Sequence, residues 1–120
     1  MRRDRGSAAV EFALIVPVVL LVAFAVIELA VVAQRQLEVT HAAREGAREA
    51  AANPDPAAAT AAVGRSLGDV AATAMVTVRR DHVVGGAAEV EVVLPHTLAA
   101  PLFGGVGVAI TGKAVMRVEQ

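Results

Sequence analysis

A long run of apolar positions lies near the N-terminus of the chain. From Phe12 to Ala33 the only ionisable residue is Glu28, and no polar residue recurs every third or fourth position, as it does on the wet face of a soluble helix. A helix over these residues is about 33 Å long, enough to cross a bilayer core of about 30 Å. The pattern predicts either a membrane-spanning helix or a secretory signal.

The helical pattern continues beyond the apolar run. Residues 34–52 contain no proline and many alanines, and small residues recur at four-residue spacing at Ala42, Gly46 and Ala50. This spacing lets another backbone approach the helix closely, although the alanine bias of the whole chain explains it equally well. We predict one helix from Ser7 to about Ala52, with the three small residues as candidate helix-packing positions.

The C-terminal part begins with a second helix and then changes its period. Asp55 followed by Pro56 is typical of a helix start, and we expect this short helix to end near Gly68. Further on, apolar and polar residues alternate as they do in half-buried antiparallel strands. The predicted strands are Met75 to Arg80, Glu89 to Leu94, and Val108 to Val118, with a hairpin at Gly85-Gly86 between the first two. The fold class is therefore α+β with a small three-stranded antiparallel sheet.

Two further features of this part are less determined by the pattern. We interpret Pro95 to Gly105 as a longer connection in which Leu98, Leu102 and Phe103 cover the end of the sheet. The order of the strands stays open. Such a small unit is marginally stable by itself, so we expect it to rest on the second half of the long helix, on sibling subunits, or on both.

Composition excludes several classes of function. The formal net charge is −1, and the chain has three Phe, no Tyr and no Trp, so neither a basic field nor stacking platforms favour nucleic-acid binding. The absence of Cys excludes disulfides and thiolate metal sites. We expect no cofactor, no metal and no nucleic-acid partner.

Two short patterns imitate chemical sites. Residues 107–113 match the first seven positions of a phosphate-binding loop, but Ala114 replaces the hydroxyl residue, and the stretch alternates like a strand. His41 and Glu45 stand four apart with Glu38 before them, but there is no second His at ligand spacing. We interpret these as a strand and a solvated helix face, and we expect a protein that is not an enzyme.

The junction between the polar tail and the apolar run is the most informative part of the sequence. The tail MRRDRG ends at Gly6, and Glu11 follows at the fifth residue of the helix, with Phe12 after it. An acid inside a spanning segment costs about 2.5–3.5 kcal/mol at mid-bilayer and less near the edge, so Glu11 is expected to have a partner. If the chain were cut after Gly6, the new amine of Ser7 would lie about one helical turn away, and the amine of a shifted neighbouring helix could also reach it.

The chain resembles the TadE-like family of tight-adherence (Flp-type) pilus assembly proteins, which are minor pilins or pseudopilins. The runs that carry the resemblance are RGSAAVEFALIVPVVLLVAFAVIELA and THAAREGAREAA. It combines Gly6, Glu11, the early Pro17 and the Ala-Arg-Glu-Gly-Ala-Arg stretch.

The resemblance implies cleavage by a membrane aspartic prepilin peptidase between Gly6 and Ser7, with Glu11 as the assembly carboxylate beside Phe12. Its implied partners are the lipid bilayer, other pilin or pseudopilin subunits, and the pilus assembly machinery. The predicted leader is only six residues long and no disulfide-bonded loop follows, so entry into the fibre stays open.

We predict a leader at residues 1–6, a transmembrane helix at 7–33, its extracytoplasmic continuation at 34–52, and a small extracytoplasmic domain at 53–120. Arg residues stand on both sides of the span, but those of the leader insert first, which favours a cytoplasmic N-terminus in the bacterial membrane. Two alternatives remain. One is an uncleaved membrane-anchored accessory protein, and the other is a small secreted binding protein with a signal peptide.

Overall fold

The structure is a computed structural model that describes residues 2–100 and 104–120. It consists of two units, the first ending at Val31 and the second running from Val32 to Gln120. The helix α1 (Arg2–Ala52) contributes to both units. It begins five residues before the predicted start at Ser7, since no residue from Arg2 to Gly6 stops a helix. Pro17 lies within it.

The second unit continues with α2 (Pro56–Leu67), which the sequence predicted from its ends. The Asp55 carboxylate Oδ1 accepts a hydrogen bond from the Ala57 N–H at 2.9 Å, and Pro56 is the first helical residue. Gly68 ends α2 with a φ of 59°, a conformation that favours glycine. A 3₁₀ helix, η1 (Gly68–Thr73), follows and was not predicted.

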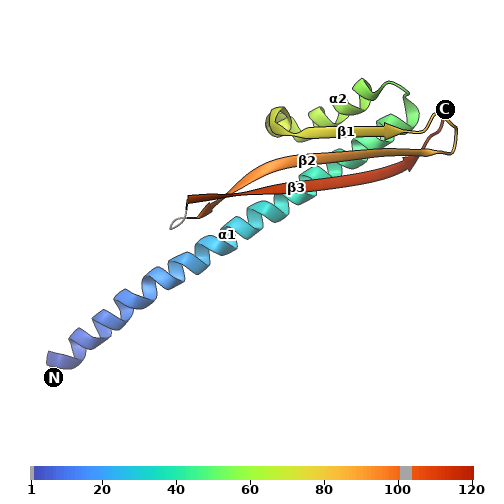
Figure 1. Cartoon of the computed structure of the whole chain (residues 1–120). Helices are drawn as coiled ribbons and strands as arrows, with labels where there is room; N and C mark the ends of the chain where they lie inside the picture. The colour runs from blue at the N-terminus through green and yellow to red at the C-terminus, as the bar shows by residue number, and fades with distance from the viewer. Residues whose placement is uncertain (1, 101–103) are drawn as a thin grey trace. The chain divides into compact units, whose positions relative to one another are not determined.

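The sheet contains β1 (Met75–Arg80), β2 (Ala87–Ala100) and β3 (Gly104–Arg117) in the antiparallel order β1-β2-β3 (Figure 1). The predicted hairpin is confirmed, because Gly85 and Gly86 lie between β1 and β2 and Gly85 has a φ of 85°. The α+β class is confirmed as well.

The predicted long connection from Pro95 to Gly105 is wrong. Most of it is strand, because β2 continues to Ala100 and β3 already begins at Gly104. Leu98 therefore lies within β2, paired with Val106, while Leu102 and Phe103 lie outside the described residues. Pro95 is tolerated because β1 pairs with β2 only as far as Val93, which leaves β2 as an edge on that side.

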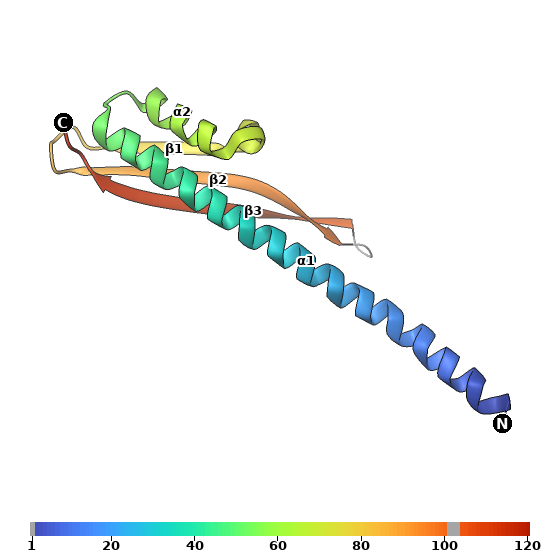
Figure 2. The same ribbon diagram turned by 180° about the vertical axis from the view of Figure 1, so that it is seen from behind.

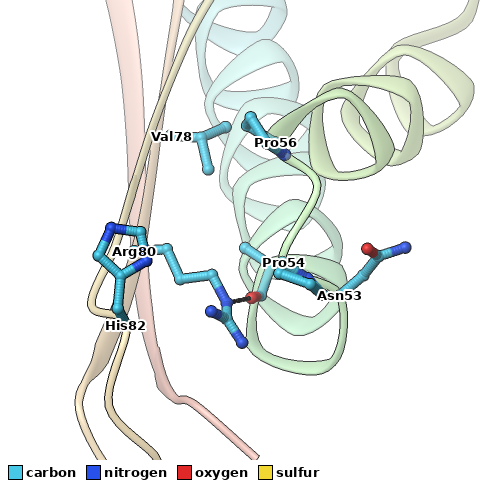
Figure 3. A pocket seen from close by; sticks show the side chains of 7 residues that line it. Asn53, Pro54, Pro56, Val78, Arg80 and His82 are labelled. Carbon is cyan, nitrogen blue, oxygen red and sulfur yellow. Dashed lines mark hydrogen bonds between the residues drawn. The ribbon is translucent and has the colours of Figure 1, made fainter. Parts of the chain in front are cut away.

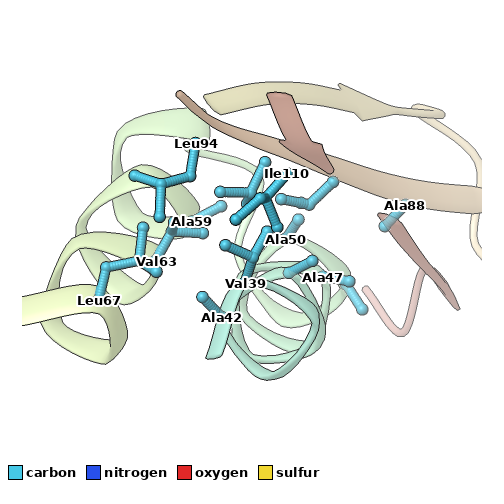
Figure 4. Packing of buried hydrophobic residues seen from close by; sticks show 14 of the residues in the cluster. Val39, Ala42, Ala47, Ala50, Ala59, Val63, Leu67, Ala88, Leu94 and Ile110 are labelled. Atoms are coloured by element: carbon cyan, nitrogen blue, oxygen red, sulfur yellow. The ribbon is translucent and has the colours of Figure 1, made fainter. Parts of the chain in front are cut away.

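The core of the second unit lies between one face of the sheet and the two helices, α2 and the Val32–Ala52 part of α1. Figure 2 shows both helices on the same side of the sheet. The predicted inward positions Val90, Val92 and Leu94 are buried. Figure 4 shows Leu94 packed in the same cluster as Val63 of α2. The sheet thus rests on the second half of the long helix, one of the two supports that the sequence predicted.

Candidate functional site

The predicted processing junction lies within α1. Gly6 and Ser7 are both exposed, and the Ser7 hydroxyl donates a hydrogen bond to Oε1 of Glu11 at 3.3 Å. The Glu11 side chain therefore reaches back one turn, to the residue that cleavage after Gly6 would turn into a free N-terminus. This geometry brings Ser7 and Glu11 together in the uncut chain.

Gly6 is not required by the packing around it. A Cβ atom placed on this residue meets no other atom within 4 Å, and its φ is not among the positive values found at other glycines. Gly in a helix interior is less stable than Ala by about 0.5–1 kcal/mol. Within the described structure, neither contact nor backbone conformation explains why a glycine stands at this position.

The surface around Glu11 is apolar and uncovered by the chain itself. Phe12 is 70% exposed, and most of the large apolar side chains from Val10 to Val31 are exposed as well. In the described residues, α1 is the one helix long and apolar enough to cross a membrane, and none of its most apolar window is buried. A membrane anchor is compatible with this surface, because lipid covers large apolar side chains that a soluble fold would bury.

The three candidate helix-packing residues lie elsewhere, in the core of the second unit. Ala42, Gly46 and Ala50 are buried, and a Cβ atom on Gly46 would lie 2.6 Å from Cγ2 of Val63 and 3.0 Å from Cγ1 of Val90. Figure 4 shows Ala42 and Ala50 facing the same cluster. The close approach at these small residues is therefore made by α2 and β2 of the same chain.

A charged pair marks α1 shortly after its apolar part. Nη1 of Arg35 donates to Oε2 of Glu38 at 2.7 Å, and Gln34 donates to the other oxygen of this carboxylate at 3.1 Å. The hydrogen bond from Arg35 is the main reason why the pKa of Glu38 lies below its ordinary value. From these residues onward, α1 carries polar groups suited to water.

A cavity of about 200 Å³ lies where α1 ends, and sequence reasoning missed it (Figure 3). Its wall includes Pro54, Val78 and His82, and Arg80 extends across it. Nε of Arg80 donates to the Ala50 carbonyl at 2.7 Å, and the same guanidinium donates to the main-chain oxygen of Gln120. One signal in the sequence could have indicated this contact. Arg80 stands two residues after Val78 in the same strand, so both side chains point to the inward face of the sheet. Because its donors are engaged by main-chain oxygens, Arg80 holds the helix end.

The two patterns that imitate chemical sites have structural explanations. Residues 107–113 lie entirely within β3, as the alternation predicted. Nδ1 of His41 lies 3.3 Å from the Ser66 hydroxyl, and no group of three metal-ligating side chains occurs in the part of the chain that the structure describes.

The fold and the junction define a class of protein: a chain with one exposed apolar N-terminal helix that continues into a small α+β unit. Within this class, residues 6–48 match the family described as TadE-like protein. The match confirms the resemblance over this segment, which includes Gly6, Glu11, Ala42 and Gly46, and it associates the chain with pilus-related systems. No curated protein and no solved structure gave a match.

Proposed function

We propose that this protein is a minor pilin or pseudopilin of a tight-adherence (Flp-type) pilus, with a structural rather than a catalytic role. A prepilin peptidase hydrolyses the Gly6–Ser7 bond, which leaves a carboxylate on Gly6 and a positive amine on Ser7. The processed chain stays in the cytoplasmic membrane through α1, with its second unit on the extracytoplasmic side, and assembles with other subunits through the apolar part of this helix.

The observation that carries this proposal is the placement of Glu11. Glu11 is exposed on a surface whose large neighbouring side chains are apolar and also exposed, and its carboxylate reaches Ser7. A carboxylate in such surroundings gains most from a positive charge, because the low dielectric strengthens the attraction. The amine of Ser7, in the same chain or in a neighbouring subunit shifted along the helix axis, supplies that charge.

Gly6 supports the proposed cleavage in a second way. The Gly6–Ser7 bond lies inside α1, so a peptidase has to unwind the helix locally before it can reach this bond. A glycine that makes no packing contact lowers the free energy needed for this unwinding, since glycine favours the helix less than any other residue except proline.

Intact mass and N-terminal sequence of the membrane-extracted protein test the cleavage. We expect a product that begins at Ser7 and disappears in cells without the prepilin peptidase. Gly6→Leu should block processing but leave membrane insertion intact. A terminus after Ala25 or Ala33 would indicate a secreted protein, and an uncut terminus would leave a plain membrane anchor.

The assembly role is tested by a matched pair of acid substitutions in the apolar part of α1. Glu11→Leu should insert at least as well as the wild type but fail to enter the assembled pilus fraction. Glu28→Leu removes the other acid of this segment, outside the motif, and should assemble normally. Normal assembly of Glu11→Leu would refute the charge-pairing role, whereas equal loss in both variants would show that the requirement for an acid is not specific to Glu11.

A further inference from the structure

The far end of the β2–β3 hairpin is a two-stranded extension of the sheet. β1 pairs with β2 only as far as Val93, so residues 94–100 of β2 and 104–110 of β3 pair with each other alone. Figure 1 shows β2 and β3 continuing beyond the end of β1. We call these residues the distal hairpin. A two-stranded hairpin by itself is at best marginally stable in water, which indicates that something else supports it.

The distal hairpin differs from the rest of the sheet in its charge. From Val92 to Gly112 the sequence contains no Asp, Glu, Lys or Arg. The outer face of the three-stranded part, in contrast, carries Glu89 paired with Arg79 at 3.5 Å and with Lys113 at 3.0 Å. Successive strand residues point to opposite faces, so the distal hairpin lacks charge on both faces.

The core-facing side of the sheet becomes exposed along this hairpin. Leu94 and its partner Ile110 are buried, but four pairs further on, on the same face, Leu98 is only partly buried and its partner Val106 is 51% exposed. A docking face for a protein would leave the opposite face charged and wet, as in ordinary antiparallel sheets. The absence of charge on both faces instead favours surroundings that exclude water from both sides.

Contacts within the second unit fix the direction in which the hairpin points. Gln36 donates to the Thr111 carbonyl at 2.8 Å, and Glu119 donates through its backbone N–H to the Ala51 carbonyl at 2.9 Å. β3 and α1 therefore run the same way, and the strand from Thr111 back to Gly104 extends toward the end of the unit where α1 becomes apolar.

The lengths show how far the hairpin extends. From Thr111 to Gly104 a strand covers about 23 Å at roughly 3.3 Å per residue. From Gln36 to Ala33, the end of the apolar run, the helix covers only about 5 Å. Even at 45° to the helix axis, the hairpin extends about 16 Å in that direction, which is more than the distance along α1 from Gln36 to Ala33.

We propose that the distal hairpin is a second membrane contact, which lies in the headgroup region of the bilayer that holds the apolar part of α1. This inference rests on the membrane anchoring in the proposed function. Among residues 2–100 and 104–120, no further strand pairs with the outer edges of these two strands, and unpaired backbone groups are not tolerated in hydrocarbon. The hairpin therefore stays at the depth where water and headgroups still bond these edges. Without basic residues, it needs no anionic lipid.

The sequence offers a clean test, because the chain contains no Trp and no Tyr. A single Trp introduced into the full chain reports only its own surroundings. Val106→Trp probes the distal hairpin, and Val115→Trp is its control on the same strand, since the two valines are 51% and 56% exposed. Val22→Trp probes the apolar part of α1. Each variant is reconstituted in phosphatidylcholine vesicles with and without brominated lipid, and circular dichroism checks that it folds.

We expect Val106→Trp to emit at shorter wavelength than Val115→Trp, to lose emission in brominated lipid, and to resist quenching by iodide. Val115→Trp should be quenched by iodide alone. If Val22→Trp is quenched by lipid but Val106→Trp is as accessible to iodide as Val115→Trp, this inference fails and the anchor stands. A blue-shifted Val106→Trp without lipid quenching also overturns it, because protein then covers the hairpin. If Val22→Trp is not quenched by lipid, the anchor fails and the inference with it.

Discussion

The helix α1 carries two kinds of surface along one backbone. In its first part, large side chains such as Phe12, Leu20 and Leu29 are exposed, while in its second part the buried positions are mostly alanines, among them Ala43 and Ala47. Both parts are helical, so secondary structure does not separate them. The two parts differ in the size of their apolar side chains, which are large and exposed in the first part and mostly small and buried in the second.

This difference follows from what surrounds each part. Large apolar side chains suit a surface covered by lipid or other helices, because each one removes more apolar area from water. In the second part, the backbone of β3 comes so close that a Cβ atom on Gly112 would lie 2.7 Å from the Val39 carbonyl oxygen. Such an approach requires a residue without a side chain at Gly112, and the small buried residues of α1 likewise let neighbouring elements pack closely against it.

We expect the largest loss of stability when a small buried side chain in the second part of α1 is replaced by a large one, like those of the first part. Ala47→Leu adds three carbons to a fully buried position of a close-packed core, and we expect a loss of about 3 kcal/mol in the free energy of unfolding. Ala25→Leu makes the same change at an exposed position of the first part and should leave this free energy unchanged. Thermal unfolding in mild detergent, followed by circular dichroism, compares the two. Equal effects would contradict the distinction between the two surfaces.

A smaller but sharper test concerns the strand that approaches α1. Gly112→Ala places its Cβ atom against the backbone of Val39 and Thr40, which cannot move aside like the end of a flexible side chain. We expect a loss of about 2 kcal/mol in unfolding free energy. Gly107→Ala is the matched control on β3, because a Cβ atom there meets nothing within 4 Å. A stable Gly112→Ala variant would show that α1 and β3 can separate without loss.

The end of the second part depends on a hydrogen bond that crosses from the sheet. Arg80→Met keeps the apolar stem but removes the donor to the Ala50 carbonyl, and we expect a loss of about 1.5 kcal/mol in unfolding free energy. Arg79→Met is the neighbouring control, whose side chain is 73% exposed and pairs with Glu89 at 3.5 Å. Its effect should be smaller, as for other surface ion pairs. Equal losses would assign the effect to charge rather than to the helix end.

The parts of the fold that sequence predicted well have local signals. Asp55 and Pro56 begin α2 through contacts within one turn, and Gly85 supplies a backbone conformation that suits a turn. The apolar run of α1 follows from an unbroken stretch of apolar residues, and the inward face of β2 follows from alternation. These elements depend on residues that are close in the sequence, so they can be predicted without a structure.

The extended hairpin and the role of Arg80 were not predictable in this way. In β2 beyond Leu94, Pro95 and His96 interrupt the alternation, and the strand exists because the β3 backbone pairs with it. Arg80 acts on Ala50, thirty positions away, and no local pattern identifies such a contact. At the junction, Gly6 and Glu11 stand out by residue type, while their cleavage and assembly roles depend on partners and stay predictions.

The smallest expected effect lies where the two parts of α1 meet, in the Arg35–Glu38 pair. The hydrogen bond from Arg35 lowers the pKa of Glu38 below its ordinary value of 4.5, so the pair stabilises the folded state while this carboxylate is ionised. Its contribution is present above pH 4.5 and is lost as the pH falls through the lowered pKa of the folded state. Because both side chains are about one-third exposed, we expect no more than about 0.5 kcal/mol. Unfolding of the wild type and of Glu38→Gln should therefore differ slightly at pH 7, this difference should disappear as the pH falls through the lowered pKa of Glu38, and salt should reduce it at pH 7. A difference that persists at low pH would mean that Glu38 acts through packing, and α1 would then need no ion pair at this boundary.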